Sequence, residues 1–314
     1  MPFPSRPLPA ETIQNLVPPL AGYPYFEYAD RFPFDPQAVA YSAVNAWWLA
    51  EASFLVYGSA EFIEAAVADS PLPAMGYQLD WLGAREQNRG LVLRHAESVL
   101  VVFRGTRLAS RELFDVAEVV VIDQDDLLTD SRFVPNACRA GGHVHNGFLE
   151  AYASVSDRLD EVLRQQRAPH QRVWLAGHSL GGALATLAAA HLPADIVQGL
   201  YTFGSPRVGD AAFAQVLPRQ SHYRFVHRND WVTLVPPEWL GFVHAGEAVA
   251  LADSGRRSVW NDLAWSADRL ANVVRVLKDR QRFQMSELPF QVPGLADHAP
   301  IYYATLLWNR LAAT

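Results

Sequence analysis

A serine in a glycine-rich turn, LAGHSLGG at residues 175–182, constrains the fold of this chain more than any other feature. The turn joins an apolar run (173–176) to an alanine-rich stretch (181–191), which predicts a strand followed at once by a helix. Gly177 and Gly181 lack the side chains that would hold the two elements apart. The pattern therefore predicts a strained turn from which the Ser179 hydroxyl projects into a cleft.

The turn also fits the G-x-S-x-G pattern that is typical of a nucleophilic serine. A helix that begins directly after such a serine supplies backbone N–H groups and a positive partial charge, both suited to stabilising an oxyanion. The alternative interpretation is a glycine-rich turn that holds a serine by chance. The strand and helix on either side favour the nucleophile.

Strand-length apolar runs surround this turn. Two runs within 91–105 predict a strand pair, and further strands are predicted at 119–123, 172–177, 199–204 and 222–227. Apolar residues at helical spacing predict helices at 36–56 and 146–166. The strand, helix, strand order around Ser179 is typical of a parallel sheet in an α/β protein.

The domain organisation follows from proline and charge patterns. Nine of the 21 prolines fall in residues 1–36, so this segment is expected to form no regular helix or central strand. We expect residues 1–37 to form an arm that lies over a single domain at 38–314. Within this domain, residues 253–290 predict a helical insertion with an apolar face and a basic face. It is either a packed surface helix or a cap that contacts lipid surfaces.

Composition excludes several classes of protein. A net charge of −7 argues against nucleic-acid binding, and Cys138, the single cysteine, cannot form an internal disulfide. No signal peptide or transmembrane stretch is visible in the sequence. We therefore expect a cytoplasmic protein, or one exported by a leaderless route; the oligomeric state is left open.

A nucleophilic serine needs a base and an acid, here expected in the order Ser, Asp or Glu, His. Asp230 ends a strand in a turn-prone Arg-Asn-Asp stretch and is the predicted acid. Downstream of it stand His244, in a predicted strand, and His298, in a loop before a helix. We predict His298 as the base and His244 as a structural residue. We predict Asp297 as a local cap.

Two backbone donors are expected to hold the oxyanion. One is the N–H of Leu180, the residue after the serine, and the other comes from Thr106, at the end of the strand VVFRG. His143 and His145 stand at alternate positions, but no zinc motif accompanies them, so no metal or cofactor is predicted. His178 is expected to pack or to form hydrogen bonds.

Six motifs, VVFRGT, VHNGF, LAGHSLGG, YTFGSPRVGD, HRNDWVTLVPP and DHAPIYY, occur in that order and resemble the class 3 lipase family of α/β-hydrolases. The resemblance runs from about Ala38 to Tyr303. It implies an α/β-hydrolase fold with a mainly parallel central sheet flanked by helices. It also implies a Ser179, Asp230, His298 triad, with Thr106 and Leu180 as the oxyanion hole.

The same resemblance implies a serine ester hydrolase that cleaves acylglycerols or similar lipid esters through an acyl-enzyme, without metal or cofactor. The implied partner is a lipid or small acyl ester, with transient contact at the lipid–water interface. Residues 107–116 occupy the place of the family's lid, or form an ordinary surface loop. The alternatives are a phospholipase A-type or acyltransferase activity and, more remotely, a non-catalytic binding protein on this fold.

Overall fold

The computed structural model describes residues 3–16, 18–85, 89–106, 135–217, 221–251 and 296–314. The predicted lid (107–116), the predicted strand at 119–123 and the predicted insertion (253–290) lie outside the described residues. The strands are β1 (Gln78–Leu82), β2 (Gly90–Arg94), β3 (Ser98–Phe103), β4 (Pro135–Ala137), β5 (His143–His145), β6 (Arg172–His178), β7 (Val197–Phe203), β8 (His222–Val226) and β9 (Glu247–Ala250). The α-helices are α1 (Ile13–Leu16), α2 (Ala43–Leu55), α3 (Ala60–Ala68), α5 (Asn146–Gln166), α6 (Leu180–His191), α7 (Ala211–Val216) and α9 (Pro300–Ala312).

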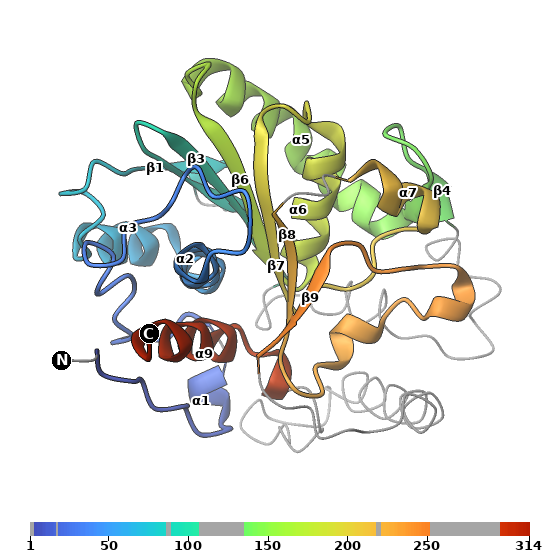
Figure 1. Cartoon of the computed structure of the whole chain (residues 1–314). Helices are drawn as coiled ribbons and strands as arrows, with labels where there is room; N and C mark the ends of the chain where they lie inside the picture. Colours follow the sequence, from blue (N-terminus) through green and yellow to red (C-terminus); the bar gives the residue numbers. More distant parts are fainter. Residues whose placement is uncertain (1–2, 17, 86–88, 107–134, 218–220, 252–295) are drawn as a thin grey trace.

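Seven of these strands form one sheet in the order β1-β2-β3-β6-β7-β8-β9 (Figure 1). β1, β2 and β3 pair antiparallel, as the strand pair predicted within 91–105 requires, and β3, β6, β7, β8 and β9 pair parallel. In the register, Phe103 pairs with Gly177, and Phe203 pairs with both His178 and Phe225. The loops that follow β3, β6, β7 and β8 therefore leave the sheet side by side at its carboxyl edge.

Helices cover both faces of the sheet. On β7, Tyr201 and Phe203 belong to the apolar cluster that includes α2 and α9, whereas Leu200 belongs to the cluster that includes α5 and α6. Side chains of a strand alternate between faces, so a strand buried on both sides reads as a nearly continuous apolar run. This three-layer arrangement is visible in Figure 1.

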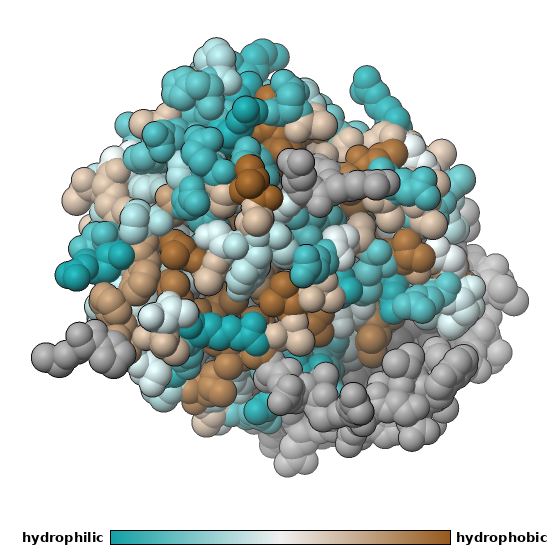
Figure 2. Space-filling model, viewed as in Figure 1, coloured by the Kyte–Doolittle hydropathy of each residue, from teal (hydrophilic) through white to brown (hydrophobic). Residues whose placement is uncertain are grey.

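Helix α5 is amphipathic. It buries one apolar stripe against the sheet and α6: Phe148, Tyr152, Val155, Leu159, Val162 and Leu163. Its other faces are polar, and hydrophilic residues accordingly dominate the surface near α5 in Figure 2. None of the helices in the described ranges is long and apolar enough to span a membrane.

The N-terminal arm is part of the core. Leu16, Tyr25, Phe26 and Phe34 are buried in the cluster that holds α2 and α9, and residues 13–16 form one helical turn, which the proline pattern had not predicted. This helical turn lies in the proline-free stretch between Pro9 and Pro18, where every backbone N–H can donate a hydrogen bond.

The first long helix begins later than the sequence suggested. The sequence predicted a helix from residue 36, but α2 starts at Ala43, where the Ser42 hydroxyl accepts a hydrogen bond from the Asn45 N–H (3.2 Å). The Asn45 side chain bonds both backbone groups of Asp35 and so holds that residue in a separate turn. Serine is a preferred N-cap, and this cap was overlooked in the sequence.

A buried ion pair fastens the arm to α2 and α9. The Glu51 side chain is fully buried and accepts hydrogen bonds from Arg6 Nη1 (2.6 Å), Tyr23 Oη (2.7 Å) and Trp47 Nε1 (2.9 Å). The backbone N–H of Arg6 also donates to Asn309 Oδ1 of α9 at 2.6 Å. Arg6 thus joins the arm to α2 through its guanidinium and to α9 through its backbone N–H.

The crossing of β6 and α6 leaves no room for side chains. A Cβ atom on Gly177 would lie 2.2 Å from the backbone of Gly181, and one on Gly181 would lie 2.2 Å from the carbonyl oxygen of Phe103. Only glycine fits either position, because each faces backbone that cannot move aside. This is the close approach that the sequence predicted for the two glycines.

The Arg6–Glu51 pair generates a stability prediction. Arg6→Met should lower the free energy of unfolding by about 3–5 kcal/mol, because it leaves a buried carboxylate without its counter-charge. Urea unfolding followed by tryptophan fluorescence measures the change. As a control, Arg85→Met breaks only an exposed pairing with Glu61 and Glu64 and should have little effect. Equal effects of the two variants would contradict the assigned role.

The glycine crossing generates a second prediction. Gly177→Ala should lower the free energy of unfolding by about 3 kcal/mol through overlap with the Gly181 backbone. Gly22→Ala is the control, since Gly22 has a positive φ of 78° but nothing within 4 Å of the added carbon. It should show only backbone strain, about 1 kcal/mol. A Gly177→Ala protein as stable as wild type would disprove the crossing geometry.

Candidate active site

Ser179 occupies a strained position between β6 and α6. Its φ of 59° and ψ of −130° are unfavourable for a residue with a side chain, and its N–H donates to the Phe203 carbonyl of β7 at 3.0 Å. The neighbouring strand thus fixes the turn. This is the sharp strand-to-helix turn that the sequence predicted.

Both predicted oxyanion donors lie beside this turn. Leu180 is the first residue of α6, so its N–H is one of those that a helix leaves without an intrahelical acceptor. Thr106 follows β3, and Gly105 before it packs so closely that a Cβ would lie 2.7 Å from the His178 carbonyl oxygen. The Thr106 hydroxyl is shielded from solvent and has no hydrogen-bond partner within the described part of the chain.

Asp230 and His298 are paired, although 68 residues separate them. His298 Nδ1 lies 2.8 Å and 3.0 Å from the two carboxylate oxygens of Asp230, so the N–H of this nitrogen donates to the acid. The carboxylate also accepts from Tyr303 Oη (2.5 Å) and from the Val232 N–H (3.0 Å). Asp230 is buried, and these three donors stabilise its charge.

The loops that carry the pair are fastened to each other. His227 Nδ1 donates to the Asp297 carbonyl oxygen at 3.0 Å, and the Asn229 N–H donates to the Asp297 carboxylate at 3.2 Å. Burial lowers the pKa of His227, so this imidazole stays neutral while it bonds. Asp297 therefore caps the turn before Asp230, whereas the sequence had suggested a cap near Asp297 itself.

His178 connects the serine turn to His298. Its Nε2–H donates to the His298 carbonyl oxygen at 2.6 Å, so its Nδ1 accepts from Tyr57 Oη at 2.8 Å. The two imidazole centroids lie 4.4 Å apart. Burial, and then the nearby His298, hold the pKa of His178 well below its usual value. The expected packing and hydrogen-bonding role is confirmed.

His244 is bonded to the turn that follows Asp230 and not to the Asp230 carboxylate. Its Nε2–H donates to the Thr233 carbonyl oxygen at 2.6 Å, and burial lowers its pKa to about 3. The residue falls in a loop before β9, with only an isolated bridge at Val243, and not in the predicted strand. This imidazole braces the turn after Asp230 and is not paired with the acid.

The two histidines of HVH have separate partners. His143 Nδ1 lies 3.0 Å from Asp210 Oδ2, whereas His145 is buried and packs on Phe148, with ring centroids 4.5 Å apart. Across the described ranges, no three His, Cys, Asp or Glu side chains gather in a way that could hold a metal.

Sequence reasoning missed several supporting residues. A Cβ on Gly204 would lie 2.5 Å from Asp230 Oδ2 and 3.0 Å from both His298 Nδ1 and Tyr303 Oη, so the position requires glycine. Tyr303 stands five residues after His298, about one and a half helical turns away, and this spacing could have suggested it. Nothing in the sequence indicated Tyr57, because its contact with His178 spans 121 residues.

Comparisons with known proteins agree with this geometry. Residues 100–239 match the family described as lipase (class 3). The secreted mono- and diacylglycerol lipase 1 of Fusarium solani is 40% identical over 124 residues, which are 37% of this chain and 37% of the relative. A secreted mono- and diacylglycerol lipase of Malassezia globosa is 35% identical over 161 residues, 48% of this chain and 51% of the relative. The chain thus spans about half or less of the length of these curated relatives.

A solved structure is also similar. The Rhizomucor miehei triacylglyceride lipase is 28% identical, with 69% of this chain and 83% of that chain covered and a TM-score of 0.49.

The predicted cytoplasmic location is contradicted by these relatives, two of which are named as secreted. The inference relied on Cys138 being the single cysteine and on no signal peptide being visible in the sequence. A chain of 314 residues buries a large apolar core and does not need disulfides to remain folded outside the cell.

The family match covers the serine turn and the acid of the site, whereas His298 and Tyr303 lie beyond its end. It begins in β3, contains Thr106, the Ser179 turn and Asp230, and ends in the proline-rich turn after the acid. The mainly parallel sheet with helices on both faces is the α/β-hydrolase fold that the motifs implied. Over residues 100–239, the chain is similar to the class 3 lipase family.

Proposed function

We propose that this protein is a serine ester hydrolase that cleaves carboxylic esters of acylglycerols through an acyl-enzyme. The carrying observation is the strained Ser179 turn at the start of α6, beside the hydrogen-bonded Asp230–His298 pair on the neighbouring loops. Nucleophile, acid and base follow one another along the chain as Ser179, Asp230 and His298, the order expected of this fold.

The proposed reaction uses His298 as base and then as acid. His298 Nε2 takes the proton of the Ser179 hydroxyl as Oγ bonds to the ester carbonyl carbon and the carbonyl π electrons move onto oxygen. Collapse of this intermediate breaks the bond to the alcohol, which leaves with that proton. Water then repeats the sequence on the acyl-enzyme and releases the carboxylic acid and the free serine.

Asp230 fixes the imidazole for this task. Its carboxylate accepts the Nδ1–H, which leaves the other ring nitrogen unprotonated and able to receive the serine proton. Tyr303 and the Val232 N–H hold the carboxylate in place. Leu180 and Thr106 are the proposed donors to the oxyanion.

The proposed substrates are lipid esters met at a lipid–water interface. The relatives from Fusarium and Malassezia are named as mono- and diacylglycerol lipases. In this chain, Leu234 and Trp239 follow Asp230 in the sequence and are exposed apolar side chains (42% and 61%). A screen of monoacylglycerols, triacylglycerol emulsions and phospholipid vesicles tests this assignment. Exclusive cleavage of phospholipids would favour the phospholipase A-type alternative.

Ser179→Ala should abolish hydrolysis of p-nitrophenyl butyrate and labelling by a fluorophosphonate while the fold is retained. The hydroxyl is the only proposed covalent nucleophile, and loss of a triad serine removes nearly all turnover. His298→Ala should be equally inactive. His244→Asn is the matched control and should keep turnover, provided that its circular dichroism is unchanged. A tenth or more of the wild-type rate in Ser179→Ala would refute the proposal.

Thr106→Val should lower kcat by about 10²- to 10³-fold with little change in KM, because a bond to the oxyanion strengthens only as charge develops. Valine keeps the β-branched shape and the backbone N–H but deletes the hydroxyl. Activity should remain above that of Ser179→Ala when both are measured on a soluble short-chain ester. An unchanged kcat would limit Thr106 to its backbone N–H.

A further inference from the structure

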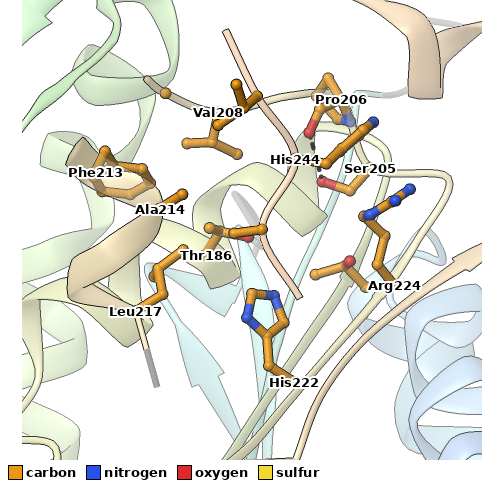
Figure 3. Close-up of a pocket in the computed structure, with 14 residues that line it drawn as sticks. Thr186, Ser205, Pro206, Val208, Phe213, Ala214, Leu217, His222, Arg224 and His244 are labelled. Carbon is orange, nitrogen blue, oxygen red and sulfur yellow. Dashed lines mark hydrogen bonds between the residues drawn. The ribbon is translucent and has the colours of Figure 1, made fainter. Parts of the chain in front are cut away.

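A small pocket lies on the α6 and α7 side of the sheet (Figure 3). Strand β8 turns Tyr223 and Phe225 toward α2 and α9, so Arg224 between them points to the opposite face, as the alternation of a strand requires. There it lines the pocket with residues of α6, α7 and the loop at 243–245. A guanidinium group is thus placed where the neighbouring strands carry apolar or hydroxyl side chains.

The charge of Arg224 is unmatched in this pocket. In the described ranges, Arg224 forms no hydrogen bond or ion pair, its Nε is shielded from solvent, and none of the pocket-lining residues is Asp or Glu. Burial and then the charge of Arg207 lower the pKa of Arg224. Among the described residues, the Nε of Arg207 also lacks a partner, but its guanidinium is paired with the Glu238 carboxylate (2.8 Å) and the Pro236 carbonyl oxygen (3.1 Å).

The other polar residues of the pocket do not compensate this charge. His244 is neutral, and its Nε2–H is committed to Thr233. The Thr186 hydroxyl donates to the Gly182 carbonyl oxygen (2.8 Å), and the Ser205 hydroxyl donates to that of Pro206 (3.2 Å). None of the described side chains that line the pocket carries a negative charge, so the Arg224 guanidinium favours a negatively charged ligand.

The size of the pocket limits that ligand. The pocket has a cavity volume of about 20 Å³, somewhat more than a single water molecule needs. A phosphate or a fatty carboxylate is much larger. We propose that this pocket binds one small inorganic anion of the size of chloride or bromide through the Arg224 guanidinium. The bound anion would neutralise the positive charge of Arg224 in this pocket.

The experiment uses the full chain and two probes. Thermal unfolding is compared in sodium chloride and in sodium gluconate at equal ionic strength, since gluconate is too large to enter. A tenfold excess of chloride over its Kd should raise Tm by about 3 °C over gluconate. Crystals grown in sodium bromide should show an anomalous peak at the Arg224 guanidinium.

The variants separate this site from general salt effects. Arg224→Met should lose the difference in Tm between the two salts, whereas Arg164→Met, which removes an exposed positive charge on α5, should keep it. Equal wild-type Tm in both salts, or the absence of the bromide peak, overturns the proposal, as does a chloride response that persists in Arg224→Met. If Arg224→Met fails to fold, the wild-type salt comparison and the bromide crystal decide the question without it.

Discussion

The approach of β6 to α6 is the constraint on which the rest of the site depends. Gly177 and Gly181 bring backbone against backbone, and the β3 carbonyl of Phe103 closes the same gap from the other side. With the elements this close, the one residue between them has to turn sharply, and Ser179 takes a positive φ. The same contact aligns the ends of β3 and β6, so Thr106 and Leu180 come to lie beside the serine.

A second constraint concerns the buried Asp230. A carboxylate shielded from water needs donors on every side, and the structure supplies them from the 3₁₀ turn after it, from His298 and from Tyr303 of α9. Removing any of them would leave a charge underpaired, at a cost of several kcal/mol. The residues that surround the proposed base and acid are therefore fixed by electrostatics as much as by packing.

The chain ends serve the same purpose at larger scale. Helix α9 provides Tyr303, which donates to Asp230, and Asn309, which accepts from the backbone N–H of Arg6 in the arm. The arm is joined to α2 by the Arg6–Glu51 ion pair. α2 in turn packs on the sheet beneath the serine turn. The arm thus supports the helix that holds the acid in place, which explains why so many of its aromatic side chains are buried.

The sequence by itself determined the local geometry: the strand-to-helix turn at Ser179, the parallel strands around it and the glycines at their crossing. These depend on neighbours along the chain, where periodicity and the small size of glycine act directly. The sequence favoured His298 over His244 as the partner of Asp230, but only the tertiary structure shows the two side chains in contact. It also placed Tyr57, Tyr303 and Gly204 around them, and among the described residues it set no carboxylate in the pocket of Arg224. Such contacts join residues far apart in the chain, and no local propensity encodes which of them will meet.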